Sequence, residues 1–475
     1  MQSGSEETIA RDTEAVLRTV DPNRHEIWSY YRLAGEAADG YPLVQTDSGP
    51  TAHPIHGTYM AIDLMTYGHK SGNETAALDA AERLLFASAK RMADDGQTLR
   101  FMYHASSGLT PYPHDFYSAL TQAHYLNAFG RLLEQRPNPR VHDILRRVFQ
   151  SMLVPVSDGG VLNDVNGVIS FEEYPSAMPS YVLNGWLTVL SELYEYGFVA
   201  KNDEAIDLVK ASTRSLAALL ERYDMPEVWS SRYSLTGNVT HKIFFKGSVP
   251  SVEEVVVSHG GEEARVDAKD ALAYSLAHIV AAPSLDNPAL TLKAAASLVR
   301  YPEPSRVSIR LRSPAGCRAV WKIGVPQYDP EHVTPRGVGQ RTLATVAVEP
   351  GESWISQEVP LDLVMGWAGS PTAFSKELAG KRYNVYHYLH VKALTQLHEF
   401  TDLPALAVWR DRWLGYTKKW PDFPLYGAEN LSHGVYSQFP HKDAETYLRD
   451  PRIKIRGGKI ERWIRQKPRH AYQES

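Results

Sequence analysis

The stretch FEEYPSAMPSYVLNGW, residues 171–186, places two carboxylates and a tyrosine before a proline, a short polar gap and an apolar run. That run continues through SYVLNGWLTVLSELYEYG, which is apolar on more than one side and therefore predicts a buried helix. Glu172, Glu173 and Tyr174 would stand at the edge of this rigid element. Two interpretations are open: a solvated loop, or acid–base groups that the helix holds in place.

Helical patterns extend outward from this stretch, from about residue 75 to 224. In AALDAAERLLFASAKRM the apolar residues recur at a spacing of three and four, with charged residues on the other side. Further helices are predicted at 116–135, at 141–153 and in DEAIDLVKASTRSLAALLERY, with Gly, Pro, Asn and Asp in the connections. Helical character returns in NVYHYLHVKALTQLHEF and LPALAVWRDRWLGYTKKW.

The pattern changes after Gly237, where short β-branched segments are bounded by turn residues: THKIFFKG, VEEVVVSHGG, RVSIRLRS, CRAVWKIG and RTLATVAVEPGESW. In RVSIRLRS, Val307, Ile309 and Leu311 alternate with polar residues, which predicts a strand with one buried face. The segment DALAYSLAHIVAAP fits neither pattern clearly. We therefore predict a β-sandwich-like module that interrupts a helical domain.

These patterns predict a mainly α protein with a β insertion. The helical hairpins in series favour an α/α toroid, in the form of an incomplete barrel, beside the β-sandwich-like module. The expected boundaries are 1–236 and 366–421 for the toroid, 237–365 for the inserted module and 422–475 for a basic C-terminal extension. For the extension, a solvated tail with local packing and contact with a polyanion or a membrane surface are both open.

Composition excludes several classes of protein. The chain has 475 residues, of which 43% are hydrophobic, enough for a sizeable core, and a formal charge of −5 that does not argue for nucleic acid. The single cysteine, Cys317, excludes an intramolecular disulfide and a cysteine-rich zinc site. The first twenty residues are charged throughout, and there is no run of about 18 apolar residues. We therefore expect a cytoplasmic protein without an integral membrane segment.

Several common catalytic motifs are absent from the sequence. It contains no GxGxxG or GxxxxGK[ST] phosphate loop, no GxSxG elbow and no HExxH motif. His387 and His390 are three apart and would share one face of a helix, but no third ligand is evident. Packing or hydrogen bonding is favoured for this pair, and we expect neither a metal nor a cofactor. The 26 Tyr and 10 Trp residues suit a core and also a sugar site, because flat rings stack on pyranoses.

Acidic and phenolic groups at element edges remain as candidates. Besides the two glutamates and Tyr174 before the buried helix, Tyr233 lies where helix gives way to β and Tyr386 where β gives way to helix. Such groups suit removal of a proton from carbon beside a carboxylate. Tyrosinate can act as the base only if a nearby cation lowers the cost of ionising it. The developing charge on the substrate carboxylate also needs donors or cations. Arg232 and Arg382, which neighbour the two tyrosines in sequence, and His387 are the candidates.

Three segments, FEEYPSAMPSYVLNGW, WSSRYSL and YHYLHVKALTQL, in this order resemble the C-terminal helical catalytic domain of the D-glucuronyl C5-epimerases. Those enzymes convert D-glucuronate to L-iduronate within a polysaccharide such as heparosan or the heparan sulfate precursor. The strongest match is E-E-Y-P at Glu172–Pro175, followed by V-L-N-G at Val182–Gly185. The resemblance covers roughly residues 40–236 and 380–420. About 150 residues separate the last two tyrosine motifs, where animal members have a short connector.

The resemblance implies an epimerase that inverts C5 of glucuronate by two-base proton abstraction and reprotonation. Its partner would be a uronate-containing polysaccharide and not nucleic acid, and a homodimer is left open. The implied catalytic residues are Glu173, Tyr174, Tyr233 and Tyr386. The candidate substrate-binding residues are Gln122, Asn184, Arg232, Arg382, His387 and His390.

Two alternatives to epimerisation stay open: another enzyme on a uronate-containing glycan, which would be a lyase or a glycoside hydrolase, and a protein without catalysis. A lyase would remove the same C5 proton and then eliminate the 4-linked sugar, so the first step is shared. A glycoside hydrolase would need two carboxylates about 5–9.5 Å apart, for which the adjacent Glu172 and Glu173 are poor partners. A protein that binds a polyanion without catalysis is the other alternative, since the C-terminus is basic and aromatic residues are plentiful.

Overall fold

The structure is a computed structural model whose described part begins at residue 33 and ends at residue 462. The described residues are 33–71, 74–110, 112, 114–165, 167–176, 178–226, 229–259, 261–267, 277–299, 305–325, 339–359, 376–378, 381–383, 385–422 and 448–462.

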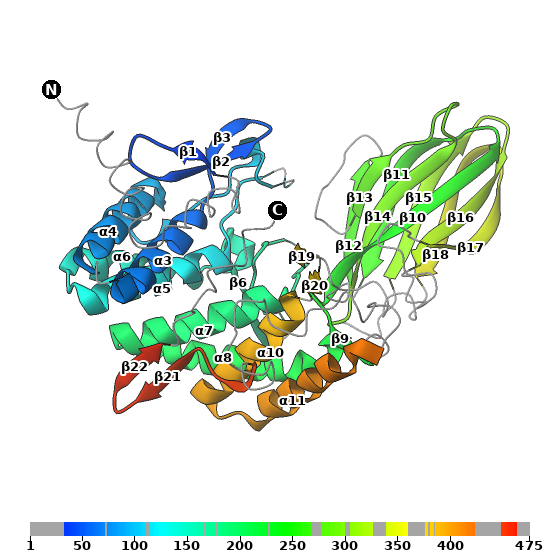
Figure 1. Ribbon diagram of the computed structural model, residues 1–475. Helices are drawn as coiled ribbons and strands as arrows, with labels where there is room; N and C mark the ends of the chain where they lie inside the picture. The colour runs from blue at the N-terminus through cyan, green and yellow to red at the C-terminus, as the bar shows by residue number, and fades with distance from the viewer. Residues whose placement is uncertain are drawn as a thin grey trace.

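Eight α-helices of these described residues form hairpins in series (Figure 1). Seven of them lie where the periodicity predicts helices, whereas the helix at His56–Ser71 was not predicted. The helix that follows the E-E-Y-P motif is central, because it contacts α5 as well as α10. The bounds are α3 (His56–Ser71), α4 (Glu74–Arg91), α5 (Ala119–Gln135), α6 (Pro139–Met152), α7 (Leu183–Ala200), α8 (Asp203–Tyr223), α10 (Val385–Thr401) and α11 (Pro404–Lys419).

Helix α7 is buried because its apolar residues cover more than one face. Trp186 and Leu190 are fully buried, and the Trp186 indole donates a hydrogen bond to Ser212 Oγ of α8 at 2.8 Å. The neighbouring helices begin at capping residues: the side chains of Asn138 and Asn202 accept backbone N–H groups at the starts of α6 and α8. The buried position of α7 fixes the segment that precedes it.

Two antiparallel sheets form a β module, drawn beside the helices in Figure 1. Their strand orders are β13-β14-β10-β16-β17 and β12-β11-β15-β18, and alternating side chains such as Val257, Ile309 and Trp321 meet in one core. The bounds are β10 (Thr236–Gly247), β11 (Ser251–His259), β12 (Glu262–Asp267), β13 (Ala277–Ala281), β14 (Ala289–Ser297), β15 (Ser305–Ser313), β16 (Cys317–Val325), β17 (Gly339–Val348) and β18 (Gly351–Val359).

Smaller sheets precede and connect the helices. A three-stranded sheet stands before α3, and several two-stranded hairpins fill the helix connections. Their bounds are β1 (Leu33–Glu36), β2 (Pro42–Thr46), β3 (Gly49–Ala52), β4 (Ala93–Asp94), β5 (Leu99–Arg100), β6 (Leu162–Val165), β7 (Val168–Phe171), β8 (Asp224–Met225), β9 (Ser230–Ser231), β19 (Lys376–Leu378), β20 (Lys381–Tyr383), β21 (Ile453–Arg456) and β22 (Lys459–Arg462).

The predicted fold class, a mainly α protein built on an α/α toroid, is wrong. Strands occur along the whole described chain, and the architecture is mixed α/β, with helical hairpins beside several antiparallel sheets. Helical periodicity reports single helices and carries no information on whether successive hairpins close a ring. Strands of two residues, such as those of β4 and β8, are too short to show an alternating pattern. The domain boundaries stay a prediction.

Part of the basic C-terminal segment packs on the helices. Gln396 of α10 exchanges two hydrogen bonds of 2.6 Å with the backbone of Ile453 in β21. The guanidinium of Arg462 pairs with the buried Glu195 and with Glu134. The charge of Arg462 is therefore paired with carboxylates of this chain, while residues 463–475 lie outside the described part. Among the described helices, none has both the length and the apolar character to cross a bilayer.

Candidate active site

The E-E-Y-P segment is held by its first glutamate. Glu172 follows β7 and is fully buried, and its Oε2 accepts hydrogen bonds from the Ser180 N–H at 2.8 Å and the Ser180 hydroxyl at 2.7 Å. Its backbone N–H donates to the Val161 carbonyl, and its carbonyl accepts the Ala119 N–H of α5. Burial raises the pKa of Glu172, and the Ser180 bonds act in the opposite direction. The Glu172 carboxyl group therefore joins the two ends of the loop that leads into α7.

The second glutamate lines a cavity. The Oε2 atom of Glu173 is buried and has no hydrogen-bond partner among the described residues. Burial raises the pKa of this carboxyl group to about 7, although a hydrogen bond from Tyr174 and the nearby His124 act to lower it. A carboxyl group with such a pKa can both take up and release a proton near neutral pH.

Gly185 of α7 makes room for this carboxyl group. A Cβ atom at position 185 would lie 2.6 Å from Glu173 Oε2 and 3.4 Å from Glu173 Cβ. Real Cβ atoms do not approach a neighbour to 2.6 Å, so any other residue here would displace the Glu173 carboxyl group. The glycine of the V-L-N-G run therefore leaves the space that the Glu173 side chain of the E-E-Y-P run occupies.

Three tyrosines accompany Glu173. The Tyr174 ring stacks on Tyr112, with ring centroids 5.8 Å apart and an interplanar angle of 12°. Tyr233 and Tyr386 make a T-shaped contact, with centroids 4.9 Å apart at 75°. Burial first, and then the Glu173 carboxyl group, raise the pKa of both Tyr174 and Tyr233 above the ordinary phenol value. Both phenols are therefore protonated at neutral pH and can serve as proton donors.

The Tyr233–Tyr386 contact is supported from behind by a buried serine. The backbone N–H of Ser231, two residues before Tyr233, donates to His387 Nδ1 at 3.1 Å. Ser231 Oγ lies 2.9 Å from His387 Nδ1 and 2.8 Å from His390 Nδ1. His387 Nε2 in turn lies 3.0 Å from the Trp413 carbonyl, so it is the nitrogen that carries the proton. These bonds join β9 to α10 and so hold the two tyrosines together.

The buried His387 leads to a prediction about stability and pH. Burial lowers the pKa of His387 to about 4, so between pH 6.5 and 4 the unfolded chain binds the proton that the folded chain excludes. The free energy of unfolding therefore falls as pH falls through this range. A shift of this size corresponds to about 3 kcal/mol for one group. Because burial also lowers the pKa of four other described histidines, the difference in urea unfolding between the wild type and a His387 variant from pH 7.5 to 4.5 measures it. These histidines are His53, His56, His241 and His390.

A matched pair of variants isolates this contribution. We expect His387→Gln to flatten the dependence of unfolding free energy on pH, whereas His142→Asn, at an exposed position of α6, leaves it unchanged. If wild type and His387→Gln lost stability equally on acidification, His387 would not be the group that excludes the proton.

Several predicted substrate-binding residues lie in the packed interior. Gln122 donates to the Leu99 carbonyl and to Ser151 Oγ, both at 2.7 Å, and accepts the Phe101 N–H at 3.1 Å. The structure thus places its amide between α5, β5 and α6. The His387 and His390 rings are fully buried and are not among the residues that line the cavity.

The predicted arginines and asparagine occupy three different settings. Arg232 is buried, and its Nε donates to the Arg222 carbonyl at the end of α8 at 3.0 Å. Arg382 lies in β20 opposite Glu377, and its side chain lies outside the described part. Asn184 stands in the first turn of α7, and its Oδ1 is buried without a hydrogen-bond partner among the described residues. Asn184 Oδ1 is thus a polar atom that no described residue uses.

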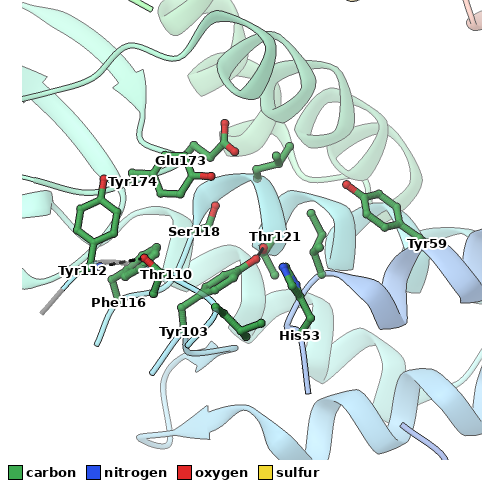
Figure 2. Close-up of a pocket in the computed structure, with 13 residues that line it drawn as sticks. His53, Tyr59, Tyr103, Thr110, Tyr112, Phe116, Ser118, Thr121, Glu173 and Tyr174 are labelled. Atoms are coloured by element: carbon green, nitrogen blue, oxygen red, sulfur yellow. Dashed lines mark hydrogen bonds between the residues drawn. The ribbon is translucent and has the colours of Figure 1, made fainter. Parts of the chain in front are cut away.

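The cavity has a volume of about 470 Å³ and is bordered mainly by aromatic and hydroxyl side chains (Figure 2). Of the predicted residues, Glu173 and Tyr174 line it, whereas Tyr233 and Tyr386 do not. Among the described residues, no lysine or arginine lines it, so the cation expected beside a tyrosinate is not found there. The lining residues are His53, Ile55, Tyr59, Tyr103, Leu109, Thr110, Tyr112, Phe116, Ser118, Leu120, Thr121, Glu173 and Tyr174.

Several cavity-lining residues were not predicted from the sequence, although they belong to two recognisable clusters. HPIHGTY, residues 53–59, and TPYPHDFY, residues 110–117, place histidines and tyrosines beside prolines in short polar segments. Neither cluster has a helical or strand period, and both approach Glu173 only through the tertiary fold. Among the described residues, no group of three or more His, Cys, Asp or Glu side chains is placed to hold a metal ion.

A carboxyl group that titrates near neutral pH, bordered by protonated phenols in an aromatic cavity, is an acid–base site of the kind that enzymes use. Residues 95–244 match the family model described as D-glucuronyl C5-epimerase C-terminus. The resemblance that the sequence predicts is therefore confirmed over this segment, which contains Glu173, Tyr174 and Tyr233. These findings support an epimerase-family function.

Two relatives match parts of the chain. The D-glucuronyl C5-epimerase of Caenorhabditis elegans is 32% identical over 124 residues, which are 24% of this chain and 20% of the relative. An uncharacterized protein of Methanocaldococcus jannaschii is 30% identical over 116 residues, which are 24% of this chain and 37% of the relative. The match thus spans about a fifth of the first relative and just over a third of the second.

Proposed function

We propose that this protein inverts C5 of D-glucuronate residues to L-iduronate within an oligo- or polysaccharide of the heparosan type. The observation that carries the proposal is the position of Glu173, whose carboxyl group has a pKa of about 7 inside an aromatic cavity. This glutamate belongs to the segment that matches the epimerase family. A group that binds and releases protons near neutral pH is what exchange at carbon requires.

The proton at C5 passes to the Glu173 carboxylate, since it is acidified by the neighbouring sugar carboxylate. A phenol on the other side of the ring, for which we assign Tyr386, gives its proton to the opposite face of C5. The inverted sugar is then released, Glu173 loses its proton to solvent, and the phenolate regains one. The tyrosines thus act as acids in the forward direction, in keeping with the raised pKa of Tyr233, which contacts Tyr386.

The rest of the cavity suits a glycan. Tyr103 and Phe116 stack with centroids 5.1 Å apart at 8°, and Tyr112 continues the aromatic surface toward Tyr174. Such surfaces bind the apolar faces of pyranose rings. The hydroxyl group of Ser118, which also lines the cavity, is available for a sugar hydroxyl, whereas Thr121 Oγ1 lies 2.8 Å from the Tyr103 hydroxyl.

The test is incubation of the protein with non-sulfated heparosan in D₂O, followed by NMR at C5 and analysis of the uronates. Deuterium at C5 together with L-iduronate is the expected result. An unsaturated uronate would identify a lyase, and a new reducing end would identify a hydrolase. An intact polymer without deuterium, repeated with other glucuronans, would contradict the proposal.

Gly185→Ala is expected to lower the epimerisation rate at least about tenfold, because the new Cβ displaces the Glu173 carboxyl group. The stability of α7 itself should increase, since Ala is favoured over Gly inside a helix by about 1 kcal/mol. The pH dependence of the rate should also shift, since the displaced carboxyl group enters a different environment. The measurements are the rate of C5 exchange as a function of pH and the Tm.

The control for this variant is Gly130→Ala in α5, where a Cβ atom would meet nothing within 4 Å. It should raise or preserve the Tm and leave exchange unchanged. Equal exchange rates and pH profiles in both variants would show that Gly185 does not position Glu173.

A further inference from the structure

One wall of the cavity comes from the first turn of α3 and the residues just before it, which precede the family-matched segment 95–244. This wall contains His53, Ile55 and Tyr59. Figure 2 shows Tyr59 and His53 on the side of the cavity away from Tyr112. The matched segment therefore supplies the acid–base groups, while another part of the chain completes the space that a ligand would fill.

The His53 side chain is held in a fixed orientation. Its ring stacks on His56, with centroids 4.3 Å apart at 8°, and meets the Tyr103 ring edge-on at 5.5 Å and 88°. Its backbone carbonyl accepts a hydrogen bond of 2.7 Å from the hydroxyl of the buried Tyr41. A rigid side chain on a cavity wall binds a ligand with little loss of side-chain entropy.

The His53 ring also has an unused polar atom. Its Nδ1 is buried and has no hydrogen-bond partner among the described residues, although a buried polar atom without a partner costs stability. Burial lowers the pKa of His53 to about 4, so the ring is neutral at pH 7. A neutral imidazole offers one N–H and one lone pair, which match a hydroxyl group that can both donate and accept.

We propose that the His53 imidazole, which lines the cavity, binds a hydroxyl group of the glycan and so selects the sugar that occupies the cavity. A hydroxyl fits better than the uronate carboxylate, because a carboxylate would favour a cation and the described lining residues include no lysine or arginine. This inference rests on the proposed function, since it takes the ligand to be the same polysaccharide.

Two variants separate the hydrogen bond from the shape of the ring. His53→Phe keeps a flat ring for the contacts with His56 and Tyr103 but removes both nitrogens. His53→Asn loses the ring but keeps a side-chain amide that can donate and accept a hydrogen bond. We expect His53→Phe to weaken binding of a heparosan oligosaccharide roughly 3- to 30-fold, and His53→Asn to restore most of that loss. Calorimetric titration at pH 7.5 measures the Kd, with His142→Asn as the surface control.

The outcomes distinguish this inference from the proposed function. If the folded wild type binds no heparosan oligosaccharide and catalyses no exchange, the proposed function fails and the inference fails with it. If the wild type binds and exchanges but His53→Phe binds equally well, or His53→Asn binds as weakly as His53→Phe, only the role of His53 is overturned. A thermal melt of each variant identifies any loss that comes from unfolding.

Discussion

Glu173→Gln is expected to abolish turnover, lowering C5 exchange by about 10²- to 10⁴-fold, which is the usual contribution of a general acid–base group. Glutamine has the same shape but cannot take up or release the proton. The fold should survive, because Glu173 Oε2 has no hydrogen-bond partner among the described residues and the glutamine oxygen can still accept the hydrogen bond from Tyr174. The rate of deuterium incorporation, measured at saturating substrate and compared with the wild type, checks the prediction.

The same substitution should also change stability in a pH-dependent way. Burial raises the folded pKa of Glu173 to about 7, above that of an unfolded glutamate, so the folded state loses stability as pH rises through 7. Glutamine cannot ionise and avoids this loss. We therefore expect Glu173→Gln to have a higher Tm than the wild type at pH 8 and a similar Tm at pH 4.5.

The adjacent glutamate supplies the control. Glu172→Gln weakens the two hydrogen bonds from Ser180, so we expect a lower Tm at pH 7 but retained exchange per folded molecule. The two variants should thus separate stability from chemistry at neighbouring positions. Near-normal exchange in Glu173→Gln, or loss of exchange in a fully folded Glu172→Gln, would contradict the assignment.

Tyr386→Phe is expected to abolish the formation of L-iduronate, again by about 10²- to 10⁴-fold. The ring contact with Tyr233 is preserved, so the variant should still fold. If Glu173 removes the proton on one face and Tyr386 returns one on the other, the variant should still exchange the C5 proton. NMR should then show deuterated glucuronate without iduronate.

Tyr194→Phe is a suitable control, because its ring stacks on Phe400 with centroids 4.2 Å apart and the residue is not among those lining the cavity. Normal epimerisation is expected in this variant. If Tyr386→Phe formed iduronate at the wild-type rate, another group would have to deliver the proton, and Tyr174 or Tyr233 would be the next to test.

Local patterns in the sequence determined the individual elements and the position of the reacting group. The three-four spacing around Leu85 and the alternation at Val307 are set by neighbours within a few residues, so this helix and this strand lie where they are predicted. The E-E-Y-P and V-L-N-G runs likewise identified the family segment. The sequence also placed Glu173 and Tyr174 at the edge of a buried helix, where burial of α7 makes that edge rigid.

Only the tertiary structure decided the fold class and the environment of the site. Ring closure and the two-residue hairpins depend on contacts between distant segments, so the predicted toroid was wrong and the architecture is mixed α/β. The same dependence explains why Gln122 is used inside the core and why His53 reaches the cavity. Above all, the pKa of Glu173 follows from removal of water by residues from other parts of the chain. Desolvation is a property of packing in three dimensions, and no spacing along a sequence records it.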